Sequence, residues 1–386
     1  MGQRPGAFPT AAAFVLFVAL GAANATLGVA MISLRERHHL DLTDGASMVT
    51  AFYLGSLAAI VGCGLAERVL APRPAMTGMI GAFAVGVAGI ALAPAWALVL
   101  VAAVVAGLGF GGLALHLNTS FAHGFGRYRV LMVNLLNAAF GVGAVAGPLL
   151  VGLGVDVRGV LVGVGVVSVL CVAAARCPVP RGDTAEVSAP AFPVVLLTLP
   201  FALVGFLYGV LETSAGTWEA TYLIWTGTPA VDAARMTALF WLGLTAGRVV
   251  ISVALFWAPP AMIICCGFGV AAVGLGLATG PDLAVLGFAV AGFGIGPVIP
   301  TLFAWLAQAT TRGRLANSVL MTCSSVANAV APVLIGFTAD QEYPAGIPLT
   351  LAVFAVLGVL AALWTAYARG KKETNAPAST VAAAAR

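Results

Sequence analysis

Residues 143–152 read Gly-Ala-Val-Ala-Gly-Pro-Leu-Leu-Val-Gly, a run without one charged side chain. The glycines at 143 and 147 stand four apart, so they clear a groove on one helix face that a neighbouring helix can enter. The proline that follows bends such a helix. The run lies inside an apolar stretch from 130 to 155, long enough to cross the roughly 30 Å hydrocarbon core of a bilayer. This segment predicts a tightly packed membrane helix.

The whole chain shares this apolar character. Of its 386 residues, 61% are hydrophobic and only 8% are charged, whereas a soluble domain carries about 25% charged residues. The formal net charge of +4 falls far short of the clustered basic face of a nucleic-acid binder, so nucleic acid is excluded as a partner. The cysteines lie in or beside apolar runs without the spacing of a disulfide framework or metal site. The composition predicts an integral membrane protein.

Only helices and closed barrels cross a bilayer, and the long unbroken apolar runs exclude a barrel. Runs between charges and prolines predict an all-α membrane protein with twelve transmembrane helices. The predicted spans are 10–34, 45–66, 75–94, 96–118, 130–155, 159–176, 193–224, 233–257, 260–280, 283–309, 315–338 and 345–368.

Positive charges test this number of spans, because cytoplasmic loops hold an excess of Lys and Arg. Of the 18 Lys and Arg residues, thirteen fall on one side of the membrane and four on the other, and Arg248 lies within a span. Both termini are on the richer side. We therefore expect a multi-pass protein of the cell membrane with cytoplasmic N- and C-termini.

The chain divides into two bundles of six helices, 1–176 and 193–368. A polar cytoplasmic linker at 177–192 joins them, and 369–386 is expected to form a mobile cytoplasmic tail. The glycines at 107, 109 and 111 recur at 292, 294 and 296, and Pro148 and Gly152 recur as Pro332 and Gly336. The two sets are shifted by nearly the same amount, which indicates an internal duplication. Parallel six-helix repeats around a mid-membrane site are the plan of one large class of secondary transporters.

On these features the chain resembles the major facilitator superfamily. The stretch 143–152 is similar to the family's GxxxGPxxG motif in the fifth helix. The family's other signature, G-x-x-x-D-R-x-G-R-R/K between the second and third helices, is degenerate here. Glu67 and Arg68 occupy its acid and base positions, but Cys63 replaces the first glycine. The resemblance implies a cytoplasmic gate through Glu67 and Arg68, and a solvated loop without a latch is the alternative.

Three stretches, 134–143, 208–218 and 240–248, look like the fucose-permease and sugar-porter-related branch of that superfamily. The resemblance implies a secondary transporter working by alternating access, with proton-coupled symport of a sugar-like or small polar solute as the first hypothesis. Fucose-type symporters carry a titratable acid in the first helix. The first span of this chain has none, and its only strongly polar side chain is that of Asn24. The glycine-proline motif also marks proton-linked exporters, so proton-driven antiport of a drug or metabolite stays open.

Charges inside a span are costly and usually face a cavity or a partner. Glu212, about 19 residues into the seventh span, is the candidate proton-coupling carboxylate; alternatively, nearby hydroxyls satisfy it. Arg248 lies about nine residues from the cytoplasmic end of the eighth span. Depths counted in this way predict no direct salt bridge between Arg248 and Glu212. Glu219, one or two turns beyond Glu212, is expected at the membrane surface without a function.

Uncharged polar pairs recur at helical spacing. Asn134 and Asn137 are three residues apart, so they share one helix face. Ser325 and Asn328 repeat that spacing in the eleventh span. Each pair either binds a ligand in the central cavity or joins helices.

Two aromatic residues hold matching positions in the two bundles, Tyr53 after Phe52 and Trp241 after Phe240. They suit stacking against a sugar or plain packing. The full set of candidate substrate-binding residues is Asn24, Tyr53, Asn134, Asn137, Tyr208, Trp241, Arg248, Ser325 and Asn328.

Residues 107–112 satisfy G-x-G-x-x-G, yet they lie within an apolar helix and follow no strand, so they are not a dinucleotide site. The chain has no P-loop and no cluster of acids or histidines typical of a membrane enzyme. We expect no enzyme activity and no cofactor or metal; the expected partners are a small solute, protons and lipid, for a protein acting as a monomer. A receptor-like membrane protein of the same fold is the alternative of a different class.

Overall fold

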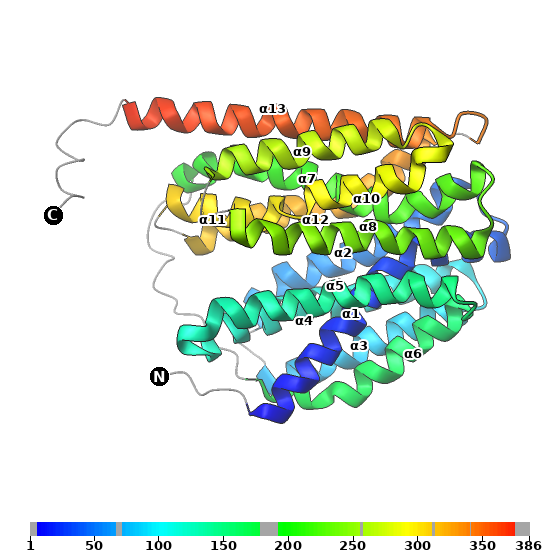
Figure 1. The fold of residues 1–386 in the computed structure, drawn as a ribbon. Coiled ribbons are helices and arrows are strands. Elements are labelled where there is room, and N and C mark those ends of the chain that lie inside the picture. The colour runs from blue at the N-terminus through cyan, green and yellow to red at the C-terminus, as the bar shows by residue number, and fades with distance from the viewer. Residues whose placement is uncertain are drawn as a thin grey trace.

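The computed structural model describes residues 6–66, 72–177, 192–254, 258–310, 313–339 and 341–374, and no strand occurs in these ranges (Figure 1). The predicted all-α fold class is confirmed. The first group of helices is α1 (Ala7–His38), α2 (Leu42–Ala66), α3 (Pro72–Leu92), α4 (Trp96–Gly124), η1 (Gly126–Tyr128), α5 (Arg129–Gly152), α6 (Val157–Leu170) and η2 (Cys171–Arg176). The second is α7 (Phe192–Trp225), α8 (Ala230–Ala254), α9 (Pro260–Leu277), η4 (Pro281–Leu283), α10 (Ala284–Ile295), α11 (Val298–Ala309), α12 (Gly313–Thr338) and α13 (Gly346–Thr374).

Within the described residues, eleven helical stretches are long and apolar enough to cross a membrane. The predicted span 233–257 corresponds to α8, which is not among those eleven. The span predicted at 283–309 is two helices, since α10 ends at Ile295 and α11 begins at Val298. Pro297 lies between them and lacks the N–H that would continue the helix. One span is thus built from two shorter helices.

The outer limits of the two bundles differ from the sequence prediction at the C-terminus. Helix α13 continues to Thr374, so residues 369–374 of the predicted tail are helical. The rest of that tail, from 375, and the linker residues 178–191 lie outside the described residues.

Local signals set several helix ends. Asp156 precedes α6, and its carboxylate accepts a hydrogen bond from the Arg158 backbone N–H at 2.9 Å, which satisfies one unpaired donor of the first turn. Gly154 and Gly227 follow α5 and α7 with φ values of 91° and 98°. This left-handed conformation suits glycine after a helix C-terminus. These turns redirect the chain between adjacent helices.

The helices of each group pack mainly on one another, and the two groups meet along α1 with α7, α2 with α12, and α5 with α8 (Figure 1). Gly143 and Gly147 of α5 face α1, where an added Cβ would collide with the carbonyls of Val18 and Ala22. The groove predicted from the glycine spacing therefore exists, and α1 occupies it.

Equivalent contacts occur in the two groups. An added Cβ at Gly107 of α4 would collide with the Phe52 carbonyl of α2, and one at Gly292 of α10 with the Phe240 carbonyl of α8. The G-x-G-x-x-G stretch is thus a helix-packing surface. The aromatic pairs at these positions of α2 and α8 also match. Phe52–Tyr53 and Phe240–Trp241 are both edge-to-face pairs, with ring centroids 5.4 and 5.2 Å apart. These matched contacts support the internal duplication.

The start of α1 and the end of α13 lie at the same end of the bundle (Figure 1), here named the terminal end; the opposite end is the far end. At the far end the two groups touch closely. Gly152, at the end of α5, has no room for a Cβ beside Arg235 of α8, and Gly336 of α12 packs beside Thr43 of α2. Near the middle, the Thr50 hydroxyl donates to the Ala329 carbonyl at 2.6 Å. The groups therefore close on each other at the far end.

Candidate functional site

An ion pair lies between α7 and α8. The Arg248 guanidinium donates to Glu212 Oε1 at 3.0 Å and to the Tyr208 hydroxyl at 2.8 Å. Tyr208 and Glu212 are four residues apart on α7, so they share one face. The side chains of Arg248 and Glu212 are 25% and 18% exposed. Tyr208 is buried at 3% exposure, so only the two charged members of these three residues, the Arg248 cluster, are partly accessible.

The first group of helices contributes a second part of the site. The Tyr53 hydroxyl of α2 donates to Asn24 Oδ1 of α1 at 2.8 Å. Tyr53 also lies close to Thr213 and Glu212 of α7. The structure therefore brings five predicted residues, Asn24, Tyr53, Tyr208, Glu212 and Arg248, into one polar region between the two groups.

The prediction that Arg248 lies too far from Glu212 for a salt bridge is wrong. That prediction counts depth from the cytoplasmic ends of the predicted spans. Counted from the far end, Glu212 lies about 20 Å along α7 from Trp225, and Arg248 lies about 27 Å along α8 from Ala230. The difference of about 7 Å in depth is one that the extended arginine side chain bridges.

Asn137 and Asn328 join helices. Asn137 Nδ2 donates to Asn118 Oδ1 of α4 at 2.9 Å and to the Val133 carbonyl at 2.9 Å. The groups around the Asn328 amide fix its orientation, because its nitrogen must face three hydrogen-bond acceptors. In that orientation it donates to the carbonyls of Gly209 and Ser324 and to the Thr213 hydroxyl. Asn328 thus ties α12 to α7 and reaches the site through Thr213.

The three remaining substrate-binding candidates differ in exposure. Asn134 is exposed, Ser325 is buried at 7% exposure, and Trp241 is buried at 2%. Trp241 packs its ring against Gly216 of α7, and its Nε1–H has no hydrogen-bond partner among the described residues. Glu67 and Arg68, the predicted gate, lie outside the described residues.

Two site residues were not predicted as ligands. Thr213 connects Tyr53 with Asn328, and Asn118 pairs with Asn137. The sequence offers the same signal for Thr213 and Asn118 as for the predicted site residues: each is a hydrogen-bonding side chain within an apolar span. Such side chains usually face a partner or a cavity inside the bundle.

The expectation that Glu219 lies at the membrane surface is wrong. Its exposed fraction is 0%, and neither carboxyl oxygen has a hydrogen-bond partner among the described residues. The predicted span 193–224 ends only one residue before α7 does, so the error lies in the packing: α1 and α8 cover this stretch of α7 on either side of Glu219.

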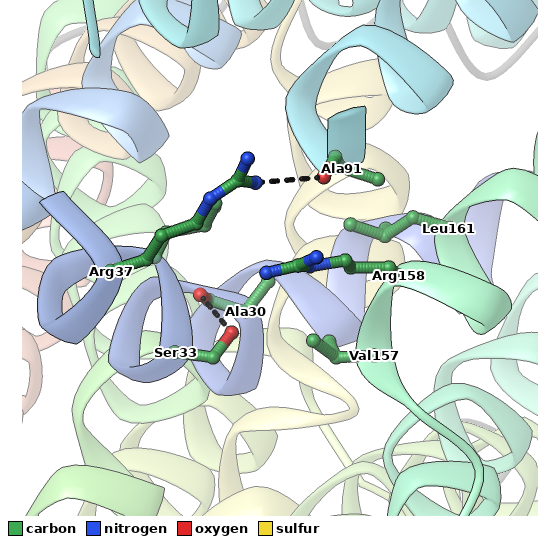
Figure 2. Close-up of a pocket in the computed structure, with 8 residues that line it drawn as sticks. Ala30, Ser33, Arg37, Ala91, Val157, Arg158 and Leu161 are labelled. Carbon is green, nitrogen blue, oxygen red and sulfur yellow. Dashed lines mark hydrogen bonds between the residues drawn. The ribbon is translucent and has the colours of Figure 1, made fainter. Parts of the chain in front are cut away.

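A separate small pocket lies at the far end of the first group, between α1, α3 and α6 (Figure 2). Arg37 and Arg158 both extend into it, and the Arg37 guanidinium donates to the Ala91 carbonyl at 3.5 Å. The pocket lies within one group of helices, so it is distinct from the central polar region.

Comparison with known proteins adds a family and a fold. Residues 13–332 match the family described as the Major Facilitator Superfamily, and no curated protein sequence matches the chain. A bacterial homologue of the human lysosomal transporter Spinster, inward-facing and unoccupied, has a similar structure with a TM-score of 0.76 and 13% identity over 93% of this chain and 96% of that one.

Two further solved structures are similar. The nucleoside transporter NupG gives a TM-score of 0.74 and 13% identity over 93% of this chain and 98% of its own. The E. coli fucose:proton symporter FucP gives 0.66 and 14% identity over 94% and 99%. At these identities the likeness is one of fold.

Proposed function

This chain belongs to the Major Facilitator Superfamily and is an integral membrane transporter, and on that premise we propose that it imports a small polar solute together with protons. The observation that carries the proposal is the Arg248 cluster, with its ion pair between α7 and α8 and with Tyr53 of the first group close to Glu212. A charged pair within a membrane span is costly and is typical of substrate and ion pathways.

The ion pair couples a proton to the solute in this scheme. Ionised Glu212 holds Arg248, whereas a proton on Glu212 removes the negative charge and weakens that hold. Leaving a partly buried charge without a partner is unfavourable. Oxygen atoms of a solute that accept from Arg248 offset this cost. Proton uptake by Glu212 and solute binding at Arg248 therefore favour each other.

The chemistry of the region favours a solute rich in hydroxyl groups. Asn24, Tyr53 and Tyr208 offer neutral donors and acceptors beside Arg248, whose planar guanidinium presents five N–H donors. Asn134, Ser325 and Trp241 are further candidate contacts, with the Trp241 ring suited to an apolar sugar face. The structurally similar proteins include a fucose:proton and a D-xylose-proton symporter, so a sugar-like solute is the first class to test.

Orientation follows from the loop charges. We place the terminal end in the cytoplasm because the positive charges concentrate in the loops on that side. The closed far end then faces outward, and the conformation is inward-facing. Residues 1–176 and 193–368 would rock against each other as units, with Glu67 and Arg68 as the proposed cytoplasmic gate. One chain contains the whole central region, so we propose a functional monomer.

The test is uptake of labelled sugars and other small polyols into proteoliposomes with an imposed inward proton gradient. We expect the gradient to drive accumulation by the wild type and solute addition to carry protons inward. Glu212→Gln should lose gradient-driven accumulation yet keep exchange of labelled for unlabelled solute, because exchange needs no net proton transfer.

Asp282→Asn is the matched control, since Asp282 is an exposed acid in η4. It should accumulate solute like the wild type. Undiminished gradient-driven accumulation by Glu212→Gln would overturn the coupling role. Outward proton movement upon solute entry would instead identify antiport.

A further inference from the structure

Glu219 is a second carboxyl group that the coupling scheme leaves unused. It lies seven residues beyond Glu212 on α7, about 10 Å nearer the far end. Seven residues are almost two whole helical turns, so Glu219 lies on the face of Tyr208 and Glu212. The two carboxyl groups thus share one face of α7 at two depths.

The position of Glu219 is where the two groups of helices close. Three residues before it, Gly216 packs against Gly28 of α1 and against Trp241 of α8. One residue after it, Ala220 forms a small apolar cluster with Val29 of α1 and Ala234 of α8. This stretch of α7 is held between one helix of each group, and Glu219 is completely buried there.

No described charged group compensates Glu219. Its side chain is 0% exposed, and neither carboxyl oxygen has a hydrogen-bond partner among the described residues. In the spans packed against α7, residues 284–309, 316–338 and 346–368 of α10 to α13 carry no Asp, Glu, Lys, Arg or His. Other charged or titratable groups lie at the far ends of α1, α8 and η4 or on helix faces that pack against α7. They are Arg35, Glu36, Arg37, His38, Asp232, Arg235, Asp282 and Cys323, together with Arg248, which is paired with Glu212.

An ionised carboxylate buried without a partner is far more costly than a neutral carboxyl group. We propose that Glu219 is a second proton-binding site, protonated whenever the far end is closed and able to exchange its proton only when the far end opens. The role of this site in transport rests on the proposed function. The binding and release of the proton at Glu219 require only that the far end opens and closes.

The step is a simple proton transfer. When the far end opens, the O–H bond of the carboxyl group breaks and the proton passes to water, leaving a hydrated carboxylate. Before closure the carboxylate takes a proton from water at the same end. The closed form therefore holds one proton more than the open form at this residue, and a low pH at the far end favours closure.

Two measurements on full-length protein in lipid nanodiscs test this without any solute. Infrared difference spectra should show the C=O band of a protonated carboxyl group that persists at neutral pH and disappears in Glu219→Gln. Spin labels at Leu153 and Val231, both exposed at the far end, report closure by their separation. In the wild type the ratio of closed to open forms should fall by up to about tenfold per pH unit as pH rises, as expected for one proton.

Glu219→Gln should remove this pH dependence, whereas Glu212→Gln and Asp282→Asn should keep both the band and the far-end response. Should Glu219→Gln fold poorly, Glu219→Met provides an apolar side chain of similar length with the same expected loss. A band that survives in the Glu219 variants, or wild-type closure independent of pH, would overturn the inference. Because neither readout involves flux, failure of the proposed symport would show separately in the proteoliposome assay.

Discussion

Arg248 holds two acceptors at once, because its Nη2 donates to both Tyr208 and Glu212. In Arg248→Lys the ammonium keeps the positive charge but lacks the planar array of five donors that can bind two neighbouring oxygen atoms of a solute. We expect the apparent solute affinity to fall by about tenfold, the equivalent of one charge-assisted hydrogen bond. The measurement is the concentration dependence of initial uptake in proteoliposomes.

Tyr208→Phe is the graded companion, because it removes one hydroxyl and keeps the ring. It should weaken solute binding by less than Arg248→Lys does. Tyr343→Phe, at an exposed tyrosine outside the helices, should leave uptake unchanged. Wild-type affinity in Arg248→Lys would mean that the guanidinium has no part in the site.

Individual polar residues of this site were predictable, but their partners were not. Glu212, Arg248 and Asn24 are conspicuous because polar side chains within apolar spans are costly. Pairing depends on how far each helix extends beyond the bilayer, and the sequence did not place Glu212 against Arg248. The burial of Glu219 depends on which helices cover the last turns of α7, and the sequence does not show this coverage.

The matched glycines of α4 and α10 provide a test of helix packing. Gly107→Ala and Gly292→Ala each place a methyl group against a carbonyl of the adjacent helix, of Phe52 and Phe240 respectively. Such overpacking costs about 1–3 kcal/mol. We expect both variants to melt at lower temperature in detergent and to yield less monodisperse protein on size exclusion.

The same change is harmless where a glycine has open space. Gly81 of α3 and Gly276 of α9 have no atom within 4 Å of an added Cβ, and alanine is the better helix former by about 1 kcal/mol. Gly81→Ala and Gly276→Ala should therefore melt at or above the wild-type temperature. Equal melting of all four variants would contradict the packing role of the matched glycines.

Apolar runs predict the existence of helices well and their continuity less well. The break between α10 and α11 falls at Gly296 and Pro297, a pair that could have been read as a helix end because proline disfavours helix in the residue before it. The extension of α13 to Thr374 was missed because Lys371 and Lys372 mark the end of an apolar span. They do not mark the end of the helix.

The conformation of the molecule is the feature least accessible from its sequence. A transporter populates more than one arrangement of the same contacts, and the sequence encodes all of them. The duplication predicts two similar halves around a central site. That the halves meet at Gly152 and Arg235, or at Thr43 and Gly336, is a property of one conformation.

Locking one end of the molecule should therefore stop transport. In a background without native cysteines, Leu153→Cys and Val231→Cys place thiols on exposed positions of the two groups at the far end. A short cleavable bis-maleimide should link them, and uptake should fall in proportion to the linked fraction because the far end can no longer open. Cleavage of the linker should restore uptake, and each single-cysteine protein should be unaffected by the reagent.

A second pair at the terminal end separates rocking from general rigidity. Val61 near the end of α2 and Asn317 near the start of α12 are both exposed at the terminal end, and we expect closure of that end to bring them nearer to each other. Cysteines at 61 and 317 should link slowly in the resting protein and faster when solute is present, because solute allows passage through the occluded state. Equal linking rates with and without solute, or full uptake by protein linked at 153 and 231, would exclude alternating access between these two groups of helices.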